Sequence, residues 1–197
     1  AAGRQRLAQV GLDTIYTTWD GLRSRSYFGI YTVRDYPQSQ LRTFTHGTTL
    51  HGQQSLIPER SREAVSYYGP TSGVALALSQ AQKLYGKGAR IGIVGLGAGT
   101  LACLRRPGED WRFFEIDPLV LRYSRDRTFT FVSQCAPDAK MVLGDARIEL
   151  ANLFHFGKTE KLHVAGCQRF AQVVFVHGQF GVTVAAIDVF ADTRGRR

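Results

Sequence analysis

The chain has 197 residues, 44% of them hydrophobic, which is enough for one domain with a buried core and a small appendage. Its 25 lysines and arginines outnumber its 16 aspartates and glutamates, giving a formal net charge of +9. The basic residues are spread along the chain without interleaved aromatic residues, and no apolar run reaches the roughly 18 residues of a membrane span. We therefore expect a cytoplasmic protein that does not bind nucleic acid and has no membrane span, and no signal-peptide pattern opposes this.

Residues 26–57 have the pattern of short strands joined by turns. The segment from Asp35 to Ser39 contains proline and polar residues typical of a turn, and His46-Gly47 and His51-Gly52 mark further turns or bulges. The pattern predicts a small antiparallel β unit ahead of the rest of the fold.

A helix is predicted from Thr71 to Tyr85, where apolar residues recur at helical spacing. Ser72 is the candidate N-cap, and Gly86 or Gly88 ends the helix.

A glycine-rich segment follows, and it is the most informative part of the sequence. Ile91 to Val94 suit a strand that is buried on both faces. Gly95, Gly97 and Gly99 then allow a sharp turn and a close approach to a ligand, after which we expect a helix to start. Because Thr100 replaces the third glycine of G-x-G-x-x-G, the segment departs from the usual dinucleotide pattern.

Two further strands end in acidic residues. The strand Phe113–Asp117 closes with Glu115 and Asp117 about 20 residues after the glycines, the distance that places a carboxylate on ribose hydroxyls. Pro118 then begins a predicted helix that ends at Arg125.

The third strand is Met141–Leu143, and Gly144-Asp145 follows it, where a carboxylate or a neighbouring amide can accept a hydrogen bond from an adenine amino group. A short helix is predicted from Ala146 to Leu153. The glycines, the two acids and Gly-Asp-Ala, in this order at strand ends, favour S-adenosylmethionine or a relative over NAD.

With these elements in place, the chain resembles the spermidine/spermine synthases (polyamine aminopropyltransferases), and in particular the bacterial spermidine synthase-like proteins. The resemblance runs from about Tyr27 to Ala151. Its most specific part is His-Gly-x-x-x-His-Gly-Gln, which general methyltransferases lack. The segments that carry it are Ser26–Val33, Thr45–Gln53, Tyr67-Tyr68, Gly95–Thr100, Glu115–Asp117 and Gly144–Arg147.

The resemblance implies a Rossmann-like class I methyltransferase fold of the α/β class, preceded by the small antiparallel β unit and incomplete at the C-terminus. The expected divisions are an N-terminal segment (1–25), the small β domain (26–69), the nucleoside-binding domain (70–151) and a divergent tail (152–197). Because this domain follows a membrane segment in some family members, the resemblance is compatible with a longer, membrane-fused parent, and a homodimer is the expected assembly.

The resemblance also implies roles for individual residues. Gln53 would contact the nucleoside, Glu115 the ribose and Asp145 the base. The remaining residues of the expected nucleoside site are Gly95, Gly97, Gly99, Asp117 and Ala146.

Tyr67 and Tyr68 are the candidates for the substrate pocket, with plain packing as the alternative. The acid that family members carry beside this tyrosine is replaced by Gly69.

The family expects a strand ending in a catalytic aspartate after Ala151. Gln172–Val176 and Val182–Ile187 are both candidates for this strand, and the second leads into Asp188 and Asp192. Asp188 is then the candidate base and Asp192 a candidate amine ligand. The alternative is a divergent tail that carries no catalytic acid.

Three functions follow, in order of preference. The first is transfer of an aminopropyl group from decarboxylated S-adenosylmethionine to a small di- or polyamine. The second is methyl transfer from S-adenosylmethionine, and the third is nucleoside binding without catalysis.

The cysteines and histidines predict no further chemistry. Cys103, Cys135 and Cys167 form no C-x-x-C pair, so we expect buried or idle thiols in a reducing compartment. The five histidines lack metal-binding spacing, so no metal site is expected.

Overall fold

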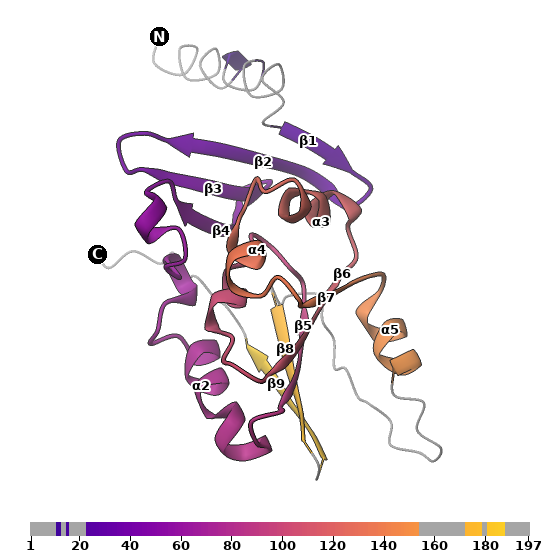
Figure 1. Ribbon diagram of the computed structural model, residues 1–197. Coiled ribbons are helices and arrows are strands. Elements are labelled where there is room, and N and C mark those ends of the chain that lie inside the picture. Colours follow the sequence, from indigo (N-terminus) through magenta and orange to yellow (C-terminus); the bar gives the residue numbers. More distant parts are fainter. Residues whose placement is uncertain (1–10, 13–14, 16–22, 154–171, 179–180, 188–197) are drawn as a thin grey trace, which may run out of the picture.

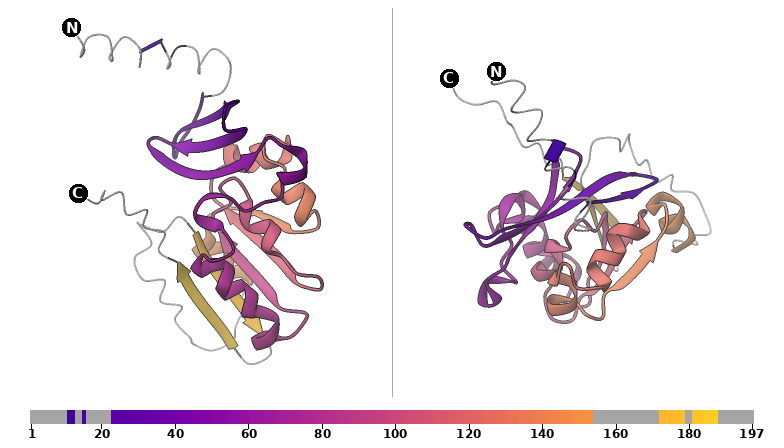
Figure 2. Two further views of the ribbon diagram at one scale, coloured as in Figure 1. Left: turned by 90° about the vertical axis from the view of Figure 1, so that its left-hand side faces the viewer. Right: turned by 90° about the horizontal axis from the view of Figure 1, so that it is seen from above.

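The computed structural model describes residues 11–12, 15, 23–153, 172–178 and 181–187. Over these ranges the chain is mixed α/β, with a four-stranded antiparallel sheet followed by a second sheet and its helices (Figure 1). No helix within them has the length and apolar character to cross a membrane. The two sheets form separate layers, with the four-stranded sheet lying across one end of the molecule (Figure 2).

The four-stranded sheet confirms the predicted antiparallel β unit. Its strands, in spatial order, are β1 (Arg23–Ser26), β2 (Gly29–Tyr36), β3 (Leu41–His46) and β4 (Thr49–Ser55). Side chains alternate between the two faces of such a sheet, and those of Tyr31, Val33 and Phe44 are buried. The pairing of β3 with β4 shifts between Phe44 and Thr45, so His51 is the extra residue of a bulge.

The second sheet has the order β7-β6-β5-β8-β9. The three strands predicted from the sequence form its parallel part: β5 (Arg90–Val94), β6 (Asp110–Glu115) and β7 (Lys140–Leu143). The other two are β8 (Gln172–Gly178) and β9 (Gly181–Ile187). Of the two candidates for the fourth strand, β8 lies beside β5, and it is antiparallel to it.

Three helices have the predicted positions: α2 (Gly73–Tyr85), α3 (Pro118–Arg125) and α5 (Ala146–Leu153). Local capping explains the first two. Ser72 Oγ accepts a hydrogen bond from Ala75 N–H at 3.2 Å, and Gly86 follows the last residue of α2. Asp117 caps α3, and Pro118 occupies its first turn, where a missing N–H costs nothing.

The expected helix after the glycines is only the 3₁₀ turn η3 (Thr100–Leu104). The backbone is extended at Arg105, and the following Pro107-Gly108 cannot continue a helix. Two other short 3₁₀ turns, η1 (Pro58–Arg60) and η2 (Ser66–Tyr68), connect the small sheet to α2.

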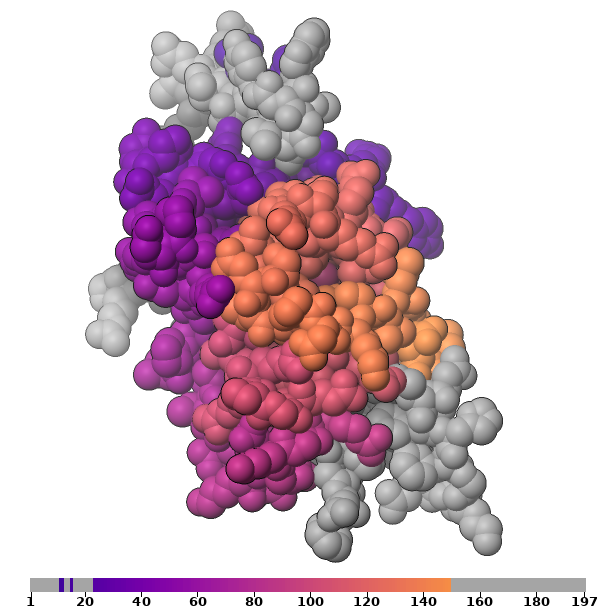
Figure 3. Space-filling model, in the orientation of Figure 1, coloured from indigo at the N-terminus to yellow at the C-terminus, as the bar shows by residue number. Residues whose placement is uncertain are grey.

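The helix α4 (Phe131–Cys135) was not predicted from the sequence. The segment from α3 to the start of α4 contacts the four-stranded sheet. The ring of Phe44 packs 5.4 Å from that of Tyr123 on α3 and 5.7 Å from that of Phe129, just before α4. The four-stranded sheet is accordingly in direct contact with the α3–α4 segment (Figure 3). The main core lies around β5, β6 and η3, whose fully buried side chains include Ile91, Ile93, Phe113, Trp111 and Leu101.

The prediction that the cysteines are free thiols is wrong for two of them. Cys103 of η3 and Cys135 of α4 form a disulfide, with their Cα atoms 4.9 Å apart. The two positions are 32 residues apart in the sequence, so only the tertiary packing of η3 on α4 brings them together. Cys167 lies outside the residues that the structure describes.

Candidate nucleoside site

The residues Gly95–Gly99, called the glycine loop below, follow directly from the carboxyl end of β5. Gly95, Gly97 and Gly99 have φ values of 85°, 55° and 87°, in the left-handed region that side chains disfavour. Two main-chain hydrogen bonds hold the loop: Gly95 N–H donates to Phe114 O at 2.8 Å, and Gly99 N–H donates to Leu96 O at 2.9 Å. The conformation that the sequence predicts for these glycines is therefore present.

Glu115, the last residue of β6, lies against the glycine loop. One of its carboxylate oxygens accepts from Leu96 N–H at 2.8 Å and the other from Asp117 N–H at 2.9 Å. The side chain is buried, and this burial raises the pKa of Glu115, with the two hydrogen bonds opposing the shift. A carboxylate has about four acceptor positions, so these two donors do not saturate it.

Asp117 is more deeply buried than expected of a residue that contacts ligand. Its Oδ1 accepts from Leu119 N–H at 2.8 Å as the cap of α3, and its Oδ2 accepts from Ser26 Oγ of β1. Burial first, and then the carboxylates of Asp117 and Glu115, raise the pKa of Tyr31 on β2. Asp117 thus forms a hydrogen bond between β1 and the segment that follows β6, and its ligand role stays a prediction.

The third element lies at the end of β7. Gly144 N–H donates to Glu115 O at 3.0 Å, which ties this end to the end of β6. Asp145 Oδ1 accepts from Arg147 N–H at 2.8 Å, and the Asp145 side chain remains 40% exposed. Ala146 is the first residue of α5. The residues predicted to contact ribose and base are therefore together at the carboxyl edge of the parallel strands.

The four-stranded sheet contacts the glycine loop through Gly52. A Cβ at Gly52 would collide with the methyl group of Ala98, so only glycine permits this contact. Side-chain alternation along β4 places the half-buried Gln53 on the face opposite Gly52 and Gln54. The contact of Gln53 with the nucleoside stays a prediction.

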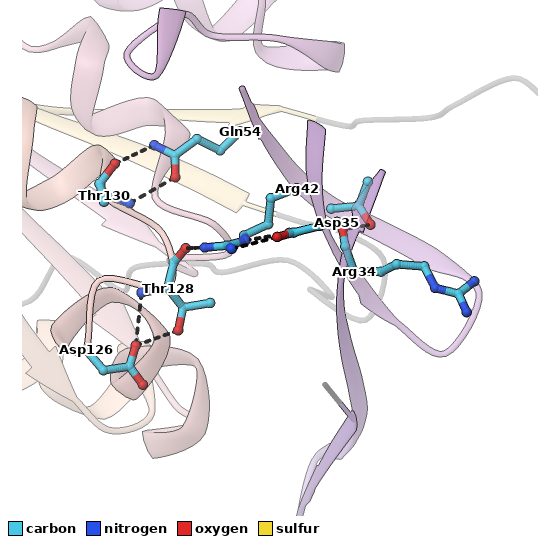
Figure 4. A network of polar contacts seen from close by, with 8 residues as sticks. Arg34, Asp35, Arg42, Gln54, Asp126, Thr128 and Thr130 are labelled. Carbon is cyan, nitrogen blue, oxygen red and sulfur yellow. Dashed lines mark hydrogen bonds and ion pairs between the residues drawn. The ribbon is translucent and has the colours of Figure 1, made fainter. Parts of the chain in front are cut away.

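Gln54, which the sequence analysis did not select, links the two layers. Its amide nitrogen donates to Thr130 Oγ1 at 2.8 Å, and its amide oxygen accepts from Thr130 N–H at 3.0 Å (Figure 4). Side-chain alternation places Gln54 on the same inward face as Gly52. A polar residue at an inward-facing position is the sequence signal that could have identified it.

Arg42 makes a second link of the same kind. Its guanidinium pairs with both oxygens of Asp35, at 2.7 and 2.8 Å, and also donates to Thr128 O at 2.8 Å (Figure 4). The bidentate pair fixes the orientation of the guanidinium toward the segment between α3 and α4.

Tyr67 and Tyr68 have the character of packing residues. Their rings lie 4.3 Å apart, Tyr68 is buried, and Tyr67 Oη donates to Leu50 O at 3.0 Å. Burial raises the pKa of both hydroxyls, so both stay protonated at neutral pH. These contacts agree best with the alternative stated above, in which the two tyrosines pack against β4.

Two histidines of the small sheet lie next to this site. The rings of His46 and His51 are 5.6 Å apart, and His46 stacks on Tyr31 at 4.7 Å. Burial, and secondarily the nearby His46, lowers the pKa of His51, which therefore stays neutral at physiological pH. Within the described part of the chain, no group of three His, Cys, Asp or Glu residues could hold a metal ion.

The candidate catalytic residues Asp188 and Asp192 lie outside the described residues. Their strand can be placed by its register. Val94 of β5 pairs with Val173 of β8, and Ile187 of β9 pairs with Gln172. The strand β9 therefore ends at the same edge of the sheet as the glycine loop, two strand spacings or about 10 Å from β5.

Comparison of the chain with models of known families, with characterised proteins and with solved structures found no significant match.

Proposed function

We propose that the protein is a spermidine synthase-like aminopropyltransferase, which uses decarboxylated S-adenosylmethionine and a small di- or polyamine. The observation that carries the proposal is Glu115, a buried carboxylate held by two backbone N–H groups beside three left-handed glycines. The class I methyltransferase fold that this assignment entails is part of the proposal.

The Glu115 carboxylate suits a ribose. Its bonds from Leu96 and Asp117 N–H fix both oxygens beside the glycine loop, and a carboxylate, with about four acceptor positions, can also accept from the hydroxyls of a vicinal diol. Asp145, partly exposed at the end of the neighbouring strand, is available to the amino group of an adenine. The glycines allow the nucleoside to approach the backbone closely.

The short η3 turn favours a nucleoside over a dinucleotide. A pyrophosphate is bound at the N-terminus of a full helix, where aligned peptide dipoles favour negative charge. Here the element after the glycines has five residues and 3₁₀ geometry, so this stabilisation is weak. A sulfonium nucleoside carries no phosphate and does not require it.

In the proposed reaction, the amine lone pair attacks the methylene group next to the sulfonium. The C–N bond forms as the C–S bond breaks, methylthioadenosine leaves, and the amine proton passes to a base. We assign this base to Asp188 and an amine contact to Asp192. The position of Ile187 at the glycine-loop edge supports the assignment, because the chain leaves β9 there. The protein contributes proximity and proton transfer.

The test is mass spectrometry of the products after incubation with decarboxylated or intact S-adenosylmethionine and a panel of diamines and polyamines. We expect amine-dependent methylthioadenosine from the decarboxylated donor, lost in Glu115→Gln and Asp188→Ala and retained in Glu63→Gln, an exposed carboxylate on the linker to α2. Formation of S-adenosylhomocysteine from the intact donor would instead assign methyl transfer. Turnover that survives Asp188→Ala would contradict the assigned base.

A further inference from the structure

The disulfide lies next to the candidate nucleoside site. Cys103 belongs to η3, which begins at Thr100, directly after the glycine loop. Cys135 is the last residue of α4. The Cys103 sulfur also lies 3.9 Å from Phe131 O at the start of α4. The covalent bond therefore joins the segment that leaves the glycine loop to the last residue of α4, and the non-covalent contact with Phe131 O reaches the first residue of the same helix.

The helix α4 is itself in contact with the glycine loop. A Cβ at Gly99 would lie 3.0 Å from Val132 Cγ2, so the backbone of the loop rests directly on this side chain. Phe131 is fully buried beside it. A displacement of α4 would thus remove the surface that supports Gly99.

The same helix is bonded to the small sheet. Thr130, immediately before α4, exchanges two hydrogen bonds with Gln54 of β4, and Gly52 of that strand packs on Ala98 of the glycine loop. The contacts therefore form a closed ring: the glycine loop continues into η3, the disulfide joins η3 to α4, Thr130 before α4 bonds β4, and β4 packs on the glycine loop. Apart from the main chain, the disulfide is the covalent connection in this ring of contacts.

We propose that the Cys103–Cys135 disulfide is a redox-sensitive cross-link that holds the glycine loop in its nucleoside-binding conformation. Reduction by a dithiol transfers two electrons and two protons to the pair, breaks the S–S bond, forms two thiols and leaves the reductant as a disulfide. Both cysteines are only partly buried, so a reductant can reach them. The reduced protein stays folded, but its glycine loop opens more often and binds the nucleoside more weakly.

The consequence for ligand affinity rests on the proposed function, whereas the effect on the loop does not. Hydrogen exchange followed by NMR in the ligand-free, full-length chain tests the loop. We expect the amides of Leu96 and Gly99 to exchange roughly tenfold faster after reduction, while the Gly86 amide at the end of α2 is unchanged. Equal exchange in the oxidised and reduced protein would overturn the proposal.

Calorimetric titration with methylthioadenosine tests the ligand. We expect at least a fivefold weaker affinity for the reduced protein and for the double variant Cys103→Ser/Cys135→Ser under oxidising conditions. The matched control is Cys167→Ser, which should respond to reduction as the unsubstituted chain does. An affinity that is independent of redox state would overturn the coupling between the cross-link and the site.

The two proposals fail differently. If the loop amides respond to reduction but methylthioadenosine binds neither form, the cross-link stands and the proposed function falls. If far-ultraviolet circular dichroism shows that reduction and the double serine substitution each unfold the whole chain, the disulfide supports the entire fold. The inference of a local cross-link is then overturned.

Discussion

At the scale of single residues, Glu115 combines two opposing influences. Burial favours its protonated form and raises its pKa, while Leu96 and Asp117 N–H groups donate to the ionised form. The nearby Asp117 carboxylate adds to the upward shift. Burial outweighs the backbone donors, so ionising this group costs the folded protein stability.

The first prediction concerns pH. Because the pKa of Glu115 is higher in the folded than in the unfolded chain, the folded chain binds more protons above about pH 4.5, and the Glu115 contribution to stability falls as pH rises through the shifted value. Methylthioadenosine affinity should rise over the same window, because the ionised carboxylate accepts from the ribose hydroxyls. Titration calorimetry and urea unfolding between pH 4.5 and 8 measure both trends.

The variant Glu115→Gln should flatten both trends and weaken binding about tenfold or more, because an amide cannot accept from both backbone donors at once. The control Glu63→Gln, on a half-exposed carboxylate, should leave both trends in place. An affinity that falls with rising pH in the unsubstituted chain would contradict the role of Glu115.

At the scale of elements, three polar contacts join the small sheet to the segments around α3 and α4, in addition to the packing of Phe44. Gln54 bonds Thr130, Arg42 bonds Thr128, and Ser26 bonds Asp117. Each pair joins residues that are far apart in the sequence and adjacent only in the folded chain.

The second prediction tests the Gln54–Thr130 contact. Gln54→Ala leaves Thr130 N–H without its acceptor near the core, so we expect a loss of about 1–3 kcal/mol in the free energy of unfolding. A double-mutant cycle with Thr130→Ala should give a coupling of at least about 0.5 kcal/mol. The exposed Arg60–Glu63 pair is the control, and its cycle should give less than about 0.5 kcal/mol. Additive effects at Gln54 and Thr130 would contradict the link.

The helices show which elements the sequence can predict. The bounds of α2 and α3 follow from local caps, Ser72 and Asp117, which act within one turn and are visible as residue types. The helix α4 has five residues and no side-chain cap, and the hydroxyl of its N-cap residue Thr130 accepts from Gln54. Its position depends on tertiary contacts and has no local signal.

The candidate site divides in the same way. The conformation of the glycine loop and the position of Glu115 at a strand end follow from residue types and spacing alone. The orientation of Gln53 depends on the bulge at His51 and on strand register, which a one-residue shift reverses. The disulfide depends on how η3 packs on α4, and the hydrogen bond of Asp117 depends on the tertiary position of Ser26. Neither contact has a local sequence signal, so neither was predicted.

At the scale of the whole molecule, the coarse fold class is confirmed, with an antiparallel sheet preceding a parallel one. The antiparallel direction of β8 was not foreseen, because the sequence pattern of a buried apolar strand is the same in both directions. The aminopropyltransferase assignment, the expected homodimer and the cytoplasmic location stay predictions.

The third prediction concerns the stability of the whole chain. The disulfide closes a loop of 32 residues, and its reduction should lower the free energy of unfolding by about 2–4 kcal/mol through the greater freedom of the unfolded chain. Since domains are stable by about 5–15 kcal/mol, the reduced protein should remain folded at 25 °C. Urea unfolding of the oxidised and reduced protein measures the difference, with Cys167→Ser as the control. A difference below about 0.5 kcal/mol would contradict it.

Residues that contact each other across the two layers are far apart in the sequence, and this separation affects how the chain folds during translation. The hairpins β1–β4 need only neighbouring residues and can pair as soon as they leave the ribosome. The residues that cover Phe44, among them Tyr123 and Phe129, follow about 80 residues later. At typical rates of translation the apolar face of the sheet waits on the order of ten seconds for its partner. We expect this interval to be the stage at which the nascent chain most needs a chaperone.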